Sequence, residues 1–114
     1  PYLLYTYARA SSILRKAKGK NPGFMIEKVT PQETALIKKL ELFPGIAKSV
    51  YNSLDPSLIA HYSFELSQLF NEFYHSCQVI EDPCEAFRLN LVSTFRIVLK
   101  SALSLLGIET IERM

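Results

Sequence analysis

The feature that most constrains this chain is an apolar period of three and four residues, with no alternating strand pattern beside it. A stripe of this kind covers one face of an amphipathic helix. From Pro56 to about Val79 the apolar positions at this spacing are Leu58, Ile59, Tyr62, Leu66, Leu69, Phe70, Phe73 and Cys77. From Asp82 to Gly107 they are Phe87, Leu91, Phe95, Val98, Leu99, Ala102, Leu105 and Leu106. The sequence therefore predicts two long helices with facing apolar stripes.

Start and stop signals divide the whole chain into helices. Thr30, Pro31 and Glu33 have the pattern of a capping box, in which two side-chain oxygens accept hydrogen bonds from backbone N–H groups at the helix start. Pro44, with glycine after it, is expected to break the chain between the second and third helices. The expected helices cover residues 2–18, 30–41, 46–54, 56–79 and 82–106. The prediction is an all-α fold, an antiparallel bundle of about five helices with a short C-terminal tail.

Length and composition favour one domain. The 114 residues are 48% hydrophobic, which suffices for one core but not for two, so residues 1–114 are expected to form a single domain. The apolar runs are too short for a membrane span, and we expect a soluble, cytoplasmic protein with no membrane partner. Cys77 and Cys84 are expected to be reduced and mostly buried.

Charge is distributed unevenly along the chain. The net charge is only +2. Residues 1–20 nevertheless contain basic side chains and no acidic ones, and the basic residues are Arg9, Arg15, Lys16, Lys18 and Lys20. A basic segment of this kind suits phosphate binding. On charge alone, a solvated helix face remains the simpler interpretation.

Motifs that would indicate catalysis or metal binding are absent from the sequence. There is no glycine-rich phosphate loop, no GxSxG and no HExxH. His61 and His75 would lie about 21 Å apart along one helix axis, too far to share a metal. The spacing of His75 to the two cysteines matches no common zinc module. We therefore expect no catalytic residue and no metal site in this chain.

Aromatic side chains stand beside polar and basic ones in two places. One group is Tyr5, Tyr7 and Arg9, and the other is Phe70, Asn71, Phe73, Tyr74 and His75. Proteins that read single-stranded RNA loops stack unpaired bases on such rings and on guanidinium planes. The spacing of Phe70 and Phe73 favours positions in the core over contact with RNA bases. For Tyr5 and Tyr74, packing within the protein and binding of RNA are equally compatible with the sequence.

Three segments, in order and over nearly the whole chain, match motifs of one protein family. Residues 4–17, LYTYARASSILRKA, resemble the pattern QYAHARxxSILRKA. Residues 70–75, FNEFYH, resemble FNxFYH, and residues 106–114, LGIETIERM, resemble an LLGIxxxERM terminus. With these three segments the chain resembles the arginyl-tRNA synthetases. No literal Asp-Ala-Leu-Arg tetrapeptide, which gives the wider superfamily its name, occurs in the sequence.

This resemblance implies the C-terminal, DALR-type anticodon-binding domain of a class I synthetase. The HIGH-type and KMSKS-type signatures of the catalytic domain are absent, so the chain is expected to be part of a longer arginine-tRNA ligase. The whole enzyme would use ATP with magnesium, while this part would have no cofactor of its own. The implied partners are the anticodon stem-loop of arginine tRNA and the catalytic domain in cis, and no DNA.

The same resemblance assigns site residues. Tyr5, Arg9, Tyr74 and Met114 would surround the anticodon loop, with stacking for the tyrosines, phosphate or base-edge contacts for Arg9, and apolar packing for Met114. Asn71 would bond either a base edge or the neighbouring backbone. The expected phosphate contacts are Arg15, Lys16, Lys18 and Lys20.

Two other interpretations remain open. One is a helical protein-interaction or docking module, with exposed apolar surface near Ile108, Ile111 and the first helix. The other is the equivalent domain of another class I synthetase. Gln78 stands where some family members carry a larger aromatic residue, and it has no ring to stack. Binding of an anticodon arm should weaken steeply with salt, whereas apolar docking should not.

Overall fold

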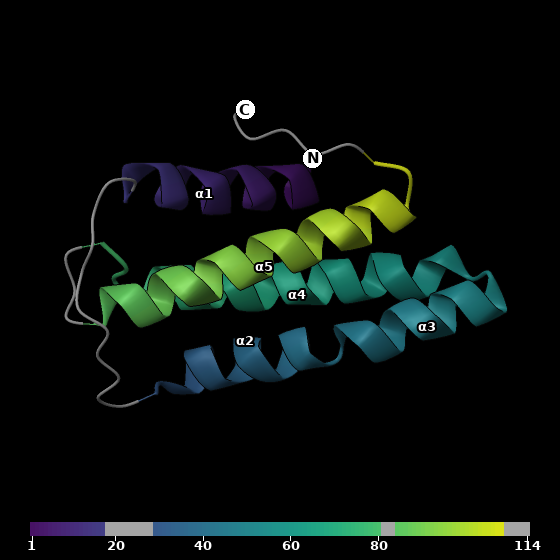
Figure 1. Cartoon of the computed structure of the whole chain (residues 1–114), viewed down its shortest axis with the longest axis horizontal. Helices are drawn as coiled ribbons and strands as arrows, with labels where there is room; N and C mark the ends of the chain where they lie inside the picture. Colours follow the sequence, from purple (N-terminus) through teal and green to yellow (C-terminus); the bar gives the residue numbers. More distant parts are fainter. Residues whose placement is uncertain (18–28, 81–83, 109–114) are drawn as a thin grey trace.

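The structure, a computed structural model, describes residues 1–17, 29–80 and 84–108. Its helices are α1 (Tyr2–Lys16), α2 (Pro31–Glu41), α3 (Phe43–Ser53), α4 (Pro56–Ser76) and α5 (Glu85–Leu105). They pack side by side as an elongated bundle, and the described residues contain no strand (Figure 1). The predicted all-α bundle is confirmed.

Helix α4 lies at the centre of the bundle and contacts the other four helices. In Figure 1, α1 lies along one side of the α4 and α5 pair, while α2 and α3 follow one another along the opposite side. Tyr2 of α1 lies beside Phe64 of α4, and Arg9 lies beside Asn71, seven residues further along both helices. Helices α1 and α4 therefore run parallel, and we call the line along which they meet the α1–α4 seam.

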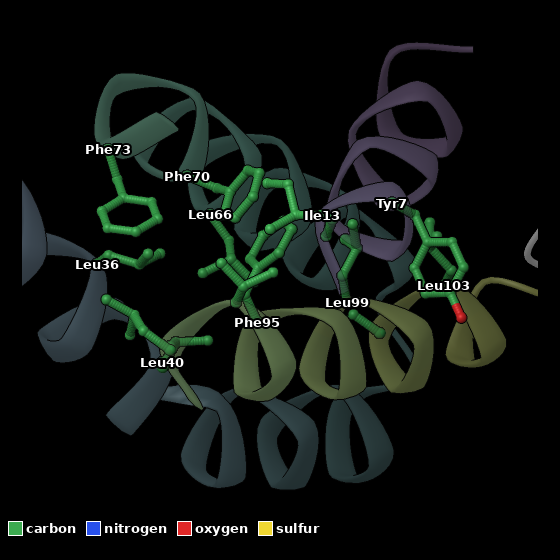
Figure 2. Close-up of a cluster of buried hydrophobic side chains, with 14 of the residues drawn as sticks. Tyr7, Ile13, Leu36, Leu40, Leu66, Phe70, Phe73, Phe95, Leu99 and Leu103 are labelled. Carbon is green, nitrogen blue, oxygen red and sulfur yellow. The ribbon is translucent and has the colours of Figure 1, made fainter. Parts of the chain in front are cut away.

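The core fills the space between α4, α5 and the helices on either side of them. Figure 2 shows the rings of Phe70 and Phe95 facing each other from α4 and α5, and these rings stack with centroids 4.1 Å apart. Phe70, Phe73 and Leu66 are completely buried, as the helical stripe predicts. Burial of each such side chain contributes about 1.5–3 kcal/mol.

Two predicted boundaries were wrong. A single turn residue, Leu42, separates α2 from α3, which begins at Phe43 and contains Pro44 in its first turn. Proline is tolerated there because the first N–H groups of a helix have no intrahelical acceptor. Helix α4 ends at Ser76, three residues before the expected end at Val79. The start signal at residues 82–83 and the tail from residue 109 fall outside the described residues.

A buried ion pair joins three helix ends. Glu33 completes the predicted capping box, because its Oε1 accepts from the Thr30 N–H at 2.8 Å while Thr30 Oγ1 accepts from the Glu33 N–H at 3.1 Å. Its other oxygen accepts from Arg88 Nε at 2.9 Å. Arg88 Nη1 in turn donates to the Gln78 carbonyl at 2.6 Å. The starts of α2 and α5 are thereby fixed to the segment that follows α4.

Removing the Glu33 carboxylate should be costly, because its side chain is only 1% exposed and Arg88, whose side chain is 11% exposed, would lose this partner. For Glu33→Ala we expect a loss of about 3–5 kcal/mol in the free energy of unfolding. The matched control is Glu65→Ala, which breaks the pair with Lys39 on a carboxylate that is 42% exposed, and it should cost about 1 kcal/mol or less. Urea unfolding followed by circular dichroism measures both, and equal losses would contradict the prediction.

The buried phenol of Tyr62 should make stability depend on alkaline pH. Its hydroxyl donates to the Lys39 carbonyl at 2.7 Å, and burial raises the pKa of Tyr62 to about 12. Because the folded pKa lies above the unfolded value of about 10, this stabilisation is complete below pH 10 and is lost as the pH rises towards 12. Between these pH values, wild type should lose about 2 kcal/mol more unfolding free energy than Tyr62→Phe. The measurement is the free energy of unfolding of wild type and Tyr62→Phe at pH 8, 10 and 12. If the two proteins lose the same free energy between pH 10 and 12, the prediction is wrong.

Candidate functional site

The α1–α4 seam brings together a guanidinium and an aromatic ring from opposite ends of the sequence. The Arg9 guanidinium carbon lies 4.5 Å from the centroid of the Tyr74 ring, within the range of a cation–π contact. Tyr74 keeps 38% of its surface exposed, because one residue step along α4 turns this position about 100° from the buried Phe73. The pair therefore combines a positive charge with an accessible ring.

Asn71 lies next to this pair. Its Oδ1 accepts a hydrogen bond from Arg9 Nη1 at 2.6 Å, and its Nδ2 donates to the Tyr2 hydroxyl at 2.9 Å. Asn71 and Tyr74 are three residues apart on α4, a spacing that places both side chains on one helix face. The structure thus brings three of the predicted site residues together, and the bonds of Asn71 go to side chains of α1 instead of the neighbouring backbone.

The two tyrosines beside Arg9 in the sequence have different environments. Tyr5 is 59% exposed and precedes Arg9 by one helical turn, so it extends the same face of α1. Tyr7 is 1% exposed, lies in the core, and has the Arg96 guanidinium 5.1 Å from its ring centroid. Tyr5 is therefore available to a ligand, and Tyr7 is a structural residue.

Sequence reasoning missed a second pair of rings on the seam. The rings of Tyr2 and Phe64 lie 5.3 Å apart, and the two residues are 39% and 47% exposed. Phe64 falls outside the apolar stripe of α4, and an aromatic residue out of phase with a helical stripe is the signal that could have revealed it. Nothing in the sequence distinguished Tyr2 from a core residue of the first helix.

A hollow of about 260 Å³ opens beside Tyr74, where the C-terminal ends of α1 and α4 meet. Its lining residues are Ile13, Lys16, Tyr74, Cys77, Gln78, Val79 and Ile80. The exposed Gln78 is held by a hydrogen bond from its Nε2 to the Ile80 carbonyl at 2.8 Å. The walls combine apolar and polar groups, and Lys16 brings a positive charge to this end of the seam.

The predicted phosphate contacts are only partly within the described structure. Arg15 and Lys16 form the last turn of α1, where Lys16 is exposed and Arg15 is half-buried. Lys18, Lys20 and Met114 lie outside the described residues. The two predicted phosphate contacts that the structure describes, Arg15 and Lys16, therefore stand at the C-terminal end of the helix that holds Arg9.

Three further features of the described residues concern metals, membranes and thiols. Among the residues that the structure describes, no three His, Cys, Asp or Glu side chains gather as they would around a metal ion. None of the helices in the described ranges combines the length and the apolar character needed to cross a membrane. Both predicted buried thiols, Cys77 and Cys84, are buried.

Residues 3–114 match the family model described as the DALR anticodon binding domain. The chain belongs to this family. Curated arginine-tRNA ligases of Phocaeicola vulgatus and Methanospirillum hungatei are 37% and 42% identical to it across the whole chain. This DALR domain spans about a fifth of the length of each of these relatives, which is 20% in both cases.

Solved structures agree with this assignment. The DALR domain superposes on the Thermus thermophilus arginyl-tRNA synthetase with a TM-score of 0.90 and 32% identity, covering 100% of this chain and 21% of that one. For the Plasmodium falciparum arginyl-tRNA synthetase the TM-score is 0.82 at 28% identity, with 99% of this chain and 21% of that one covered. The family and fold predicted from the three sequence segments are confirmed.

Proposed function

We propose that this DALR domain binds the anticodon arm of an arginine tRNA with its α1–α4 seam. The observation that carries the proposal is the Arg9–Tyr74 pair, in which a half-buried arginine holds its guanidinium over an accessible ring. Family membership supports an anticodon arm as the ligand, and the names of the relatives support an arginine tRNA.

Each side chain of the seam has a physical role in this proposal. Tyr5 and Tyr74 present rings on which unpaired bases stack. Arg9 donates hydrogen bonds to a phosphate or to base acceptors, in the planar arrangement that lysine lacks. Met114 packs against the loop. The proposed phosphate contacts, which position the arm without reading its sequence, are Arg15, Lys16, Lys18 and Lys20.

The whole enzyme is part of the proposal. Residues 1–114 act as a single anticodon-binding domain within a cytoplasmic arginine-tRNA ligase. A catalytic domain in cis uses ATP with magnesium to attach arginine to the tRNA, and DNA is not a ligand. The support is that this chain corresponds to only 20% of the length of the arginine-tRNA ligases that it matches.

A second candidate role is docking onto another part of the enzyme. Tyr51 and Leu54, at the end of α3, are each 83% exposed, and Ile108 after α5 is 37% exposed. Exposed apolar groups near one end of a bundle suit contact with a further protein surface. Ile111, the other residue expected here, lies outside the described residues.

Titration with RNA tests the proposed function directly. The wild-type chain should bind the anticodon stem-loop of an arginine tRNA more tightly than a stem-loop whose middle anticodon base, the C shared by arginine anticodons, is changed. Binding should weaken as salt rises, because each neutralised phosphate releases counterions. Fluorescence anisotropy at two salt concentrations measures both effects. Equal binding of the two RNAs would mean that the seam binds phosphates without reading the anticodon. Binding that does not depend on salt would favour apolar docking.

Substitutions at the seam test the residues. Arg9→Ala and Tyr74→Ala should each weaken stem-loop binding by about 1–3 kcal/mol, because each removes a stacking or charged contact. Two exposed residues of α3 serve as matched controls, Lys48→Ala for Arg9 and Tyr51→Ala for Tyr74, and neither should change the affinity. Circular dichroism measures helicity in parallel. A loss of helicity comparable to the loss of binding would assign the residue to the fold instead of the site.

A further inference from the structure

The side-chain amide of Asn71 is engaged by protein groups at both ends. Its oxygen accepts from Arg9 at 2.6 Å, and its nitrogen donates to the Tyr2 hydroxyl at 2.9 Å and lies 3.4 Å from Thr6 Oγ1. Because a guanidinium can only donate hydrogen bonds, the oxygen end must face Arg9 and the nitrogen end must face Tyr2. The orientation of the amide is thus fixed by its partners, and its polar groups are already used within the protein.

Tyr2 and Thr6 hold the amide from α1. Thr6 Oγ1 donates to the Tyr2 carbonyl at 2.9 Å, so its lone pairs remain available to Asn71. The Tyr2 ring packs against Phe64 with centroids 5.3 Å apart, which fixes the position of the phenol oxygen. Tyr2, at the start of α1, therefore anchors the Asn71 amide on α4. This amide in turn holds the guanidinium of Arg9, two turns further along α1.

The neutrality of Asn71 has a consequence for the charge of Arg9. A carboxylate in this place would orient the guanidinium but would also compensate its charge, as Glu33 does for Arg88. In the ranges that the structure describes, no carboxylate forms an ion pair with Arg9. The amide thus fixes the direction of the guanidinium while its positive charge stays available to a polyanion.

We infer that Asn71 is a positioning residue, which together with the Tyr2 hydroxyl orients Arg9 on the Tyr74 ring before RNA arrives. Arg9 then contacts the RNA, and Asn71 acts through Arg9 without reading a base edge itself. A guanidinium that is already oriented loses less conformational freedom when it binds, so the same contacts give a higher affinity. This inference rests on the proposed function and assigns a separate role within the same seam.

A double-mutant cycle distinguishes positioning from direct contact. The variants are Arg9→Ala, Asn71→Leu, their combination, and Tyr2→Phe, each titrated with the arginine anticodon stem-loop. Asn71→Leu should weaken binding about three- to tenfold, and Tyr2→Phe should weaken it less. In the Arg9→Ala background, Asn71→Leu should cause no further loss, because coupled residues are not additive. Additive losses, or wild-type affinity in Asn71→Leu, would overturn the inference.

Two more variants separate orientation from charge. Asn71→Asp keeps an acceptor for Arg9 but compensates its charge, so it should bind RNA more weakly than Asn71→Leu at low salt. Asn90→Leu, at an exposed asparagine of α5, is the matched control and should bind as wild type does. Equal binding by Asn71→Asp and wild type would contradict the argument from charge.

A measurement on the free protein makes the test independent of the RNA. Side-chain ¹⁵N NMR should show a resolved, immobilised Arg9 guanidinium in wild type and in Asn71→Asp, and a rotationally averaged one in Asn71→Leu. If wild type binds no stem-loop, the proposed function fails, while the NMR spectra still decide whether Asn71 orients Arg9. An averaged Arg9 signal in wild type would overturn the positioning role whatever the RNA data show.

Discussion

The buried ion pair between Glu33 and Arg88 is the interaction on which the arrangement of the helix ends depends. One carboxylate caps α2 and also accepts from an arginine near the start of α5, and that arginine donates to the carbonyl of Gln78 just after α4. Two charges removed from water stabilise a fold only when their remaining hydrogen-bonding groups are also satisfied. Here these bonds fix the segment that follows α4 at Gln78, four residues beyond Tyr74, so this end of the seam is held by a pair that does not belong to the seam.

Helix α4 serves the core and the seam with adjacent residues. Phe70 stacks on Phe95 of α5, and Phe73 lies beside Leu36 of α2 (Figure 2). Asn71 follows Phe70 and Tyr74 follows Phe73, and both of these residues contact Arg9 of α1. A step of one residue rotates a side chain by about 100° around the helix axis, so the same helix contributes side chains to the core and to the α1–α4 seam. Because the core side of α4 is completely packed, the seam residues stand on a rigid support, which is what a preorganised site requires.

The sequence predicted the helices and the core well because both follow from short-range patterns. The capping box of Thr30 and Glu33 and the burial of Phe70 and Phe73 needed only spacing and residue type. The start of α3 was wrong because Pro44 is compatible with both a break and a first helical turn, and only packing against α4 decides between them. At the candidate site, the sequence named Arg9, Asn71 and Tyr74, and the structure brings these three residues together. The Tyr2 hydroxyl as a partner of Asn71 depends on a contact across 69 residues, and no local signal encodes it.

Three basic residues of this bundle differ in their partners, and this difference supports the proposal that Arg9, unlike Arg88 and Lys39, binds a ligand. Arg88 has a buried carboxylate as its partner, and Lys39 pairs with Glu65 at 2.7 Å, so both charges are compensated within the fold. Arg9 instead has an amide oxygen at 2.6 Å and an aromatic face at 4.5 Å, two partners that orient a cation without cancelling its charge. A cation that is oriented but not compensated retains its attraction for a polyanion, and attraction to phosphate dominates affinity for nucleic acids. The choice of a neutral partner at position 71 therefore links the local geometry of α1 and α4 to the ligand that the seam is proposed to bind.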